Sequence, residues 1–273
     1  MFVMSNVSLL NSFNKVTKNK TAKNELVEKL SSGKRINRAA DDSAGLSISE
    51  SLKAQVRGMS MAEKNIQDGI SMIQVADGAM DDITKTIHRM KELAVESSNG
   101  TLEDSDREKL QQEFSKLKNN IDYIANETEF NTIKLLDNDK TLTIKVKDDP
   151  YVSYDLKLFD STTKALKLSD LNIDKFNSAN NAISKVDVAL EKVLGNRTVL
   201  GAHLNNLKSS FNDVSNQGGN TTHSLSQIED INMATALMRS VKESIVINSN
   251  KSMLVAAKQN NENVNTVLNK WLL

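Results

Sequence analysis

The most constraining feature of this sequence is a long run of apolar residues spaced alternately three and four positions apart. The run begins at Ile183 and ends at Val214, and only Arg197 interrupts it. This spacing places apolar side chains on one narrow stripe of a helix, which then packs against other helices. The sequence therefore predicts a long helix with a seam for helical partners. The seam consists of Ile183, Val186, Leu190, Val193, Leu200, Leu204, Leu207, Phe211 and Val214.

Two further seams are predicted in the N-terminal half. The first comprises Met59, Ile66, Ile70, Ile73, Met80, Ile83, Ile87, Met90 and Ala94, and the second comprises Leu110, Phe114, Leu117, Ile121 and Ile124. Between them, Gly100 is expected to end one helix, and Thr101 or Ser105 to cap the next. The chain has 1 proline among 273 residues, which fits long uninterrupted helices because proline breaks them.

The middle of the chain changes its period. Apolar residues alternate with polar ones on both sides of the turn-forming letters "DDP", which predicts a β-hairpin near 141–159 with one buried face. Residues 161–177 are expected to form an irregular connection. The predicted fold class is therefore mainly α, a long antiparallel helical bundle or coiled-coil rod, with a small β-hairpin region in the middle of the chain.

Composition and motifs argue against several function classes. The 35 basic and 35 acidic residues balance, so the basic footprint of a nucleic-acid-binding protein is absent, and without cysteine there is no thiolate metal site. No apolar run reaches the roughly 20 residues that span a membrane, and the first residues lack the pattern of a cleaved secretory signal. We interpret His88 and His203 as helix-surface residues. We expect no catalytic residues, no cofactor and no metal, and hence no enzyme.

Both ends of the chain are predicted to be helices with apolar residues along one edge. Leu10 and Phe13 mark this edge near the N-terminus, and Val264 and Leu268 mark it near the C-terminus. Neither end is expected to be stable alone, since isolated helices are marginal in water. Their simplest partners are each other and neighbouring copies of the chain.

A charged joint separates the N-terminal helix from the next one. In "SSGKRINRAADDSAGLSISESL", Gly33 is expected to end the first helix, and Asp41 or Asp42 to start the second. Lys34, Arg35 and Arg38 are expected to face these two aspartates. The residues alone leave open whether the joint is a plain corner between helices or a contact between subunits.

This stretch resembles the N-terminal signature of bacterial flagellins. The resemblance continues through "AEKNIQDGISMIQVADGAMDDITKTIHRMKELAVESSNGT" and "NETEFNTIKLL", and "LGAHLNNL" and "QIEDINMATA" resemble the C-terminal signature. It implies a structural subunit of the extracellular flagellar filament, which serves motility and self-assembles through paired terminal helices. Residues 1–45 and 231–273 would form one discontinuous inner-tube domain, with the joint as its spoke. Residues 46–230 would form a helical shell domain, without an outer variable domain.

The resemblance also implies partners. They are further copies of the chain in a helical filament, the filament cap, the hook–filament junction proteins, and an export chaperone that binds within about residues 231–273. Export would use the flagellar type III apparatus without cleavage of a signal peptide. The segment "IHRMKELAVESSNGT" resembles the site that vertebrate Toll-like receptor five recognises, with Arg89, Leu93 and Glu113 at the matching positions. On chemistry alone, Leu93 would pack inside the bundle while Arg89 and Glu113 form a surface ion pair.

Two alternative hypotheses for the function remain. The C-terminal signature departs from the family pattern at several positions, so a minor flagellin or a hook–filament junction protein is the alternative within this class. The departures are at Leu204, Asn206, Gln227, Asn232 and Ala236. From another class, a helical signalling hairpin would also show apolar seams, although it would need neither apolar ends nor a β-hairpin.

Overall fold

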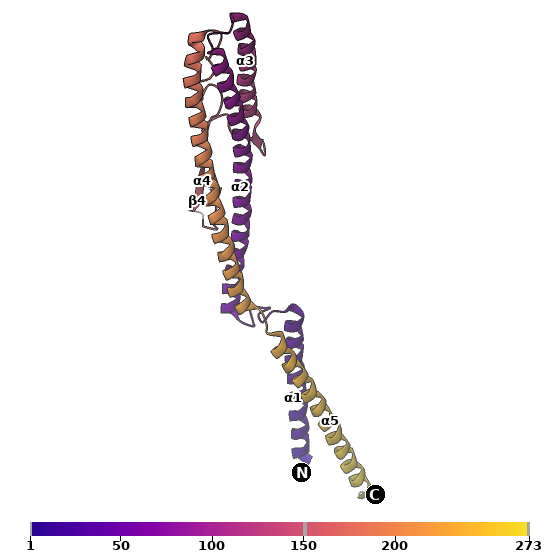
Figure 1. Cartoon of the computed structure of the whole chain (residues 1–273). Helices are drawn as coiled ribbons and strands as arrows, with labels where there is room; N and C mark the ends of the chain where they lie inside the picture. The colour runs from indigo at the N-terminus through magenta and orange to yellow at the C-terminus, as the bar shows by residue number, and fades with distance from the viewer. Residues whose placement is uncertain (1, 150–151, 272–273) are drawn as a thin grey trace. The chain divides into compact units, whose positions relative to one another are not determined.

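The computed structural model of the chain describes residues 2–149 and 152–271, and long helices dominate this part (Figure 1). In chain order the elements are α1 (Phe2–Ser32), α2 (Ser43–Ser97), α3 (Asp104–Glu127), β1 (Glu129–Phe130), β2 (Ile133–Lys134), β3 (Lys140–Lys145), β4 (Ser153–Leu158), α4 (Phe176–Glu229) and α5 (Met233–Trp271). The predicted fold class, long antiparallel helices with a small β-hairpin in the middle of the chain, is confirmed.

The chain divides into two compact units. The terminal unit contains residues 1–54 and 221–273, and the central unit contains residues 55–220. In the terminal unit, α1 packs against α5. Residues of the long helices α2 and α4 belong to both units, because the division falls within each helix.

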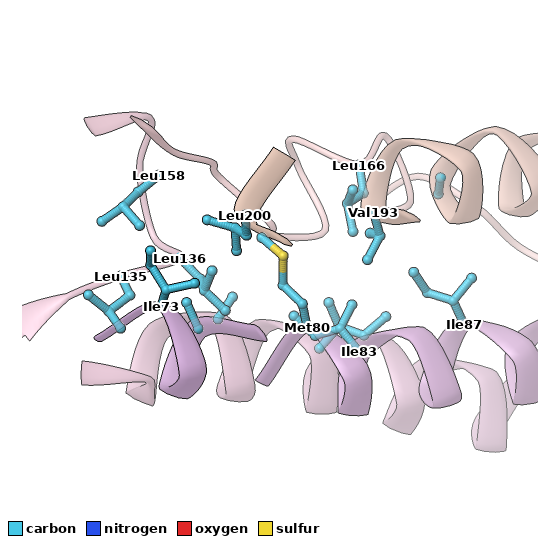
Figure 2. Close-up of a cluster of buried hydrophobic side chains, with 14 of the residues drawn as sticks. Ile73, Met80, Ile83, Ile87, Leu135, Leu136, Leu158, Leu166, Val193 and Leu200 are labelled. Carbon is cyan, nitrogen blue, oxygen red and sulfur yellow. The ribbon is translucent and has the colours of Figure 1, made fainter. Parts of the chain in front are cut away.

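The central unit is built on the predicted seams. Helices α2 and α4 are antiparallel, because ion pairs join Asp77 to Arg197 and Lys91 to Asp187. All nine predicted seam residues of α2 are buried, and the seam residues of α4 are buried or partly buried against them. Figure 2 shows α2 side chains such as Met80 and Ile83 opposite Val193 and Leu200 of α4. Fully burying a side chain of this size contributes about 1.5–3 kcal/mol, so this seam is the main stabilising feature of the central unit.

Arg197 interrupts the α4 seam because it is a polar cross-link between the two helices. Its Nε and Nη1 atoms each lie 2.9 Å from a carboxylate oxygen, of Asp77 and Asp81 respectively. The hydrogen bond to Asp77 and the nearby charge of Asp81 raise the pKa of Arg197, although partial burial opposes this. The one charged residue in the seam therefore fixes the register of α4 on α2.

The turn between α2 and α3 differs from the sequence prediction. Helix α2 ends at Ser97, before Gly100, and the N-cap of α3 is Glu103, which makes no side-chain capping bond. The predicted caps Thr101 and Ser105 are therefore wrong. Arg107 fixes the turn instead. Its buried guanidinium donates to the backbone carbonyls of Ser97 (3.0 Å) and Asn99 (2.9 Å).

The hairpin β3–β4 lies close to its predicted position. Leu142 pairs with Leu156 and Ile144 with Tyr154, and these side chains share the covered face. The predicted turn residue Pro150 lies outside the described residues.

The Tyr154 hydroxyl lies 2.6 Å from Nδ1 of His203, so the prediction that His203 is a surface residue was wrong. Burial and the charge of Lys157 lower the pKa of this histidine.

The short hairpin β1–β2 contains a strained turn. Phe130 pairs with Ile133, so Asn131 and Thr132 form a two-residue loop, with φ of 48° and 67°. Such loops require positive φ at both positions and favour glycine at the second. A β-branched residue is unusual there. The Thr132 hydroxyl donates a 2.6 Å hydrogen bond to the Asn131 carbonyl, which offsets part of the strain.

Replacing Thr132 by glycine should stabilise the central unit. The side chain is exposed, so little packing is lost, and relief of left-handed strain outweighs the entropy of glycine by about 0.5–1 kcal/mol. Thermal unfolding should show a melting temperature a few degrees higher. Thr132→Ala is the control, because it removes the hydroxyl but keeps the strain, and should not stabilise. A melting temperature below that of the parent for Thr132→Gly would contradict this assignment.

Candidate functional site

The joint is a backbone crossing between two distant segments of the chain. Helix α1 ends at Ser32, and Gly33 follows with φ of +70°, the conformation in which glycine commonly ends a helix. The Arg35 amide donates to the Glu229 carbonyl (2.6 Å), and the Ile231 amide donates to the Gly33 carbonyl (3.0 Å). The segment after α1 and the segment after α4 are therefore tied together as an antiparallel bridge.

Arg35 caps the end of α4 at this crossing. Its Nε and Nη2 atoms donate to the Ile228 carbonyl at 3.2 and 2.7 Å. The last carbonyls of a helix lack partners within the helix and carry partial negative charge, so a guanidinium there is favourable. Arg35 thus couples the course of the chain after α1 to the end of α4.

Glu229 is the central acid of the joint. Its side chain is 5% exposed, and its two oxygens accept bonds from Lys34 (2.5 Å) and Lys53 (2.8 Å). Burial alone would raise the pKa of Glu229, but the bonds from the two lysines outweigh it, so the pKa lies below its ordinary value. Hydrogen bonds from Glu229 and Glu50 raise the pKa of Lys53. One carboxylate therefore joins the segment after α1, the start of α2 and the end of α4.

The two aspartates of the joint organise its backbone. Asp41 accepts bonds from the amides of Asn37 and Arg38, both at 3.1 Å, and forms an ion pair with Lys29 at 3.0 Å. The hydrogen bond from Lys29 and the two backbone bonds lower the pKa of Asp41. Asp42 accepts the Gly45 amide at 2.8 Å and caps α2. The prediction that one of these aspartates starts the second helix is confirmed.

The predicted charge pairing across the joint was mostly wrong. Of the charged side chains of Lys34, Arg35 and Arg38, only that of Arg35 forms an ion pair with a joint aspartate, at 3.9 Å from Asp42. Lys34 pairs with Glu229, and Arg38 pairs with Glu28 at 2.8 Å. Sequence reasoning missed Glu229 because it lies almost 200 residues from the basic cluster. The sequence did carry one signal: the joint has three basic residues but only two acidic ones, which indicates that an acid from elsewhere in the chain pairs with it.

The three residues expected to face a receptor lie in the central unit. Arg89 of α2 donates through Nε and Nη2 to Glu113 of α3 at 3.0 and 2.9 Å, and through Nη1 to Glu92 at 2.9 Å. These two acids raise the pKa of Arg89. Leu93 is fully buried in the core. The exposed part of this set is therefore an ion pair, whereas the leucine belongs to the core.

Helix α5 has two distinct faces. Ala236 and Ile247 are buried on the side where the helix packs in the terminal unit. On another face, Leu237, Met238, Val241 and Ile245 form a continuous apolar stripe, each more than half exposed. The predicted terminal residues Leu10 and Phe13 of α1 are also exposed, at 60% and 58%. The side chains of Val264 and Leu268 lie outside the described residues.

The described part of the chain carries neither a metal site nor a membrane-spanning helix. In residues 2–149 and 152–271, no group of three or more acidic or histidine side chains is placed to hold a metal ion. No helix in that part of the chain combines the length and apolar character needed to cross a membrane.

Comparison with known proteins gives a consistent picture. The sequence model of the bacterial flagellin N-terminal helical region matches residues 3–141, and that of the C-terminal helical region matches residues 183–268. Flagellin of Bacillus subtilis strain 168 is 36% identical over 299 residues, covering 97% of this chain and 98% of that protein. Flagellin of Halalkalibacterium halodurans is 37% identical over 262 residues, covering 95% and 96%.

Solved structures agree with the sequence relatives. The crystal structure of Bacillus cereus flagellin has a TM-score of 0.50 at 31% identity, covering 59% of this chain and 94% of that one. A protein proposed to be flagellar hook-associated, from Vibrio parahaemolyticus, has a TM-score of 0.61 at 15% identity, covering 70% and 100%. At that identity, the second likeness shows a shared fold alone.

These findings define the class as a filament-forming structural protein with helical termini. The chain belongs to the bacterial flagellin family. It is a structural subunit of the extracellular flagellar filament, which assembles from copies of one chain, and it is not an enzyme.

The joint predicts a pH-dependent stability. Glu229→Gln removes the charge between Lys34 and Lys53, and at pH 7 should weaken the crossing by about 1–2 kcal/mol, since hydrogen bonds to charged groups are the stronger ones. Hydrogen exchange at the Arg35 and Ile231 amides should then be about 5–30-fold faster. Glu50→Gln is the matched control, because Glu50 also bonds Lys53 but is exposed.

The sign with pH follows from the lowered pKa of Glu229. A lowered acid pKa stabilises the folded joint above the ordinary value of 4.5, and the stabilisation is lost as pH falls through the lowered pKa. The difference in protection factors between parent and Glu229→Gln should therefore disappear in acid. A difference that persists unchanged at the lowest pH would exclude the carboxylate as its cause.

Proposed function

We propose that copies of this flagellin join through the α5 stripe of Leu237, Met238, Val241 and Ile245. The observation that carries the proposal is the division of α5 into a packed side and an exposed apolar face within the terminal unit. A contiguous exposed apolar surface commonly marks an interaction site. The partner is a second copy, since the family forms filaments from one chain and a formal net charge of +0 produces no net repulsion between copies.

The joint has a separate role in this proposal. We propose that the inner-tube domain comprises residues 1–45 and 231–273, and that the helical shell comprises residues 46–230. The joint, residues 33–42, would form the spoke between them, through Gly33, Arg35, Arg38, Asp41 and Asp42. The support is the tie between the segments after α1 and after α4, which lets both terminal helices leave the joint together. Further contacts between subunits would come from four apolar residues near the chain ends, Leu10, Phe13, Val264 and Leu268.

Before assembly, the apolar stripe needs protection from premature contact. We propose that an export chaperone binds within residues 231–273, and that the chain leaves through the flagellar type III apparatus without losing a signal peptide. In the filament it would also meet the cap and the hook–filament junction proteins. Loss of chaperone co-purification when α5 alone is deleted would support the first contact, and unchanged co-purification would exclude it.

Ile245→Asp should block filament growth while leaving the monomer folded. Ile245 is 63% exposed, so the substitution removes little internal packing but places a charge in the proposed interface. Seeded assembly followed by sedimentation should show pelleted protein falling about tenfold or more, since one unpaired buried charge costs several kcal/mol. Arg239→Ala is the control, because Arg239 is an exposed cation of α5 further around the helix from the stripe, and its loss lowers the net charge by the same one unit. Normal growth by Ile245→Asp would refute the proposed interface.

We also propose that the free monomer is recognised by Toll-like receptor five at the surface formed by Arg89 and Glu113. The support is an exposed arginine–carboxylate pair that bridges two helices, with donors left to meet a partner. Arginine is over-represented in interaction hot spots. Leu93 would act from the core by fixing the position of Arg89, rather than by direct contact.

Arg89→Ala should weaken signalling in receptor-bearing cells severalfold, as expected for loss of about 1 kcal/mol or more at a hot spot. Lys109→Ala is the control, since Lys109 is also an exposed cation in an ion pair, on α3, and is more exposed than Arg89. Circular dichroism should be unchanged for both variants. Leu93→Ala is unsuitable as a test, because a core cavity costs about 2–5 kcal/mol by itself. Equal signalling by Arg89→Ala and the parent would remove this surface from the receptor site.

A further inference from the structure

The turn between α2 and α3 contains the one Asn-Gly pair of the whole sequence, Asn99–Gly100. Asparagine followed by glycine is the dipeptide most prone to spontaneous deamidation, because the backbone nitrogen of the following residue attacks the side-chain amide and glycine offers no Cβ to hinder it. Elsewhere in the chain every asparagine precedes a residue with a side chain. Position 99 therefore has the most reactive neighbour of all asparagines in this protein.

The surroundings of the pair leave the reaction free to proceed. Both residues are exposed, and a Cβ built on Gly100 would meet no atom within 4 Å. Among the described residues, no acceptor is found for the Gly100 amide, whereas the amides of Asn99 and Leu102 donate to the carbonyls of Glu96 and Asn99. The attacking nitrogen is thus not engaged in the turn that positions it.

The turn also polarises the group that is attacked. The Thr101 amide donates to Oδ1 of Asn99 at 3.2 Å, which folds the side-chain amide back over the Gly100 backbone. Negative charge develops on Oδ1 when the nitrogen adds to Cγ, and an N–H donor fixed at that oxygen stabilises it. Meanwhile Arg107 holds the Asn99 carbonyl, so the turn keeps its position on the bundle.

We propose that Asn99 is a self-modification site, which converts to aspartate or isoaspartate without an enzyme. Loss of a proton from the Gly100 amide is followed by formation of its bond to Cγ of Asn99. The C–N bond of the side-chain amide then breaks, and ammonia leaves with a proton from water. The resulting succinimide adds one water molecule and opens at either carbonyl. Opening at the backbone carbonyl gives isoaspartate, and opening at the side-chain carbonyl gives aspartate.

The product changes the charge and the course of the turn. Either product places a carboxylate on residue 99 itself, the residue whose backbone carbonyl Arg107 binds. In the isoaspartate product the chain runs through Cγ and is one carbon longer, and the former backbone carbonyl of residue 99 becomes the carboxylate, so Arg107 would face a charged carboxylate where it now binds a peptide carbonyl. Because no enzyme is required, the modified fraction of a subunit population increases with time after synthesis.

The test uses the purified full chain, incubated at 37 °C in buffers of neutral and mildly alkaline pH. Trypsin releases residues 92–107, whose one asparagine is Asn99, so a mass gain of about 1 Da in this peptide reports the reaction at that site. Incubation in ¹⁸O-water adds the heavy oxygen only to newly formed product. The rate should rise with pH, because the nucleophile is the deprotonated amide.

Gly100→Ala is the decisive variant. The open space around Gly100, and a backbone conformation outside the left-handed region, let alanine fit without disturbing the turn. The added Cβ should slow deamidation about tenfold or more, a barrier change of about 1.4 kcal/mol. The internal control is Asn248–Ser249 within α5, which should react slowly in both proteins. Equal rates for Asn99 and Asn248, or an unchanged rate in Gly100→Ala, would overturn the proposal.

Discussion

The terminal unit is governed by one feature of α5: this helix carries more apolar surface than the rest of the same chain buries. On its packed side, only a few apolar residues such as Ala236 and Ile247 are buried among those described, whereas Leu237, Val241 and Ile245 are exposed to water. Burial of apolar surface is the main favourable term in folding and in association. Under the proposed interface, a helix with this division gains further stabilisation from neighbouring subunits, which is the property a filament subunit needs. The central unit differs, because its seams are closed within one chain.

The joint holds the terminal helices in place without burying their apolar faces. Its backbone crossing and the carboxylate of Glu229 tie the segments after α1 and α4 to the start of α2. These are polar and charged contacts, which are directional but individually modest. The terminal helices can thus be positioned together, while their apolar faces stay available. Arg197 has a comparable role in the central unit, where a polar bridge sets register and apolar packing supplies most of the stabilisation.

The sequence predicted what is local and periodic. The α2 and α4 seams and the β-hairpin were found because side-chain burial repeats with the period of the element. It failed where partners are distant or local sterics compete. Glu229 meets Lys34 from the far end of the chain, His203 is covered by a hairpin strand, and Arg107 replaces the capping side chain expected before α3. The α5 stripe was anticipated only as apolar termini, because its free face is defined by what α1 covers.

The most direct test of the central claim is hydroxyl-radical footprinting of α5, with the free monomer compared to the assembled filament. We expect Leu237, Met238, Val241 and Ile245 to react readily in the monomer and to become strongly protected in the filament. Reactivity at exposed positions of the central unit that take no part in contacts should stay the same. Equal labelling of the four stripe residues in monomer and filament would contradict the claim that this face of α5 joins the subunits.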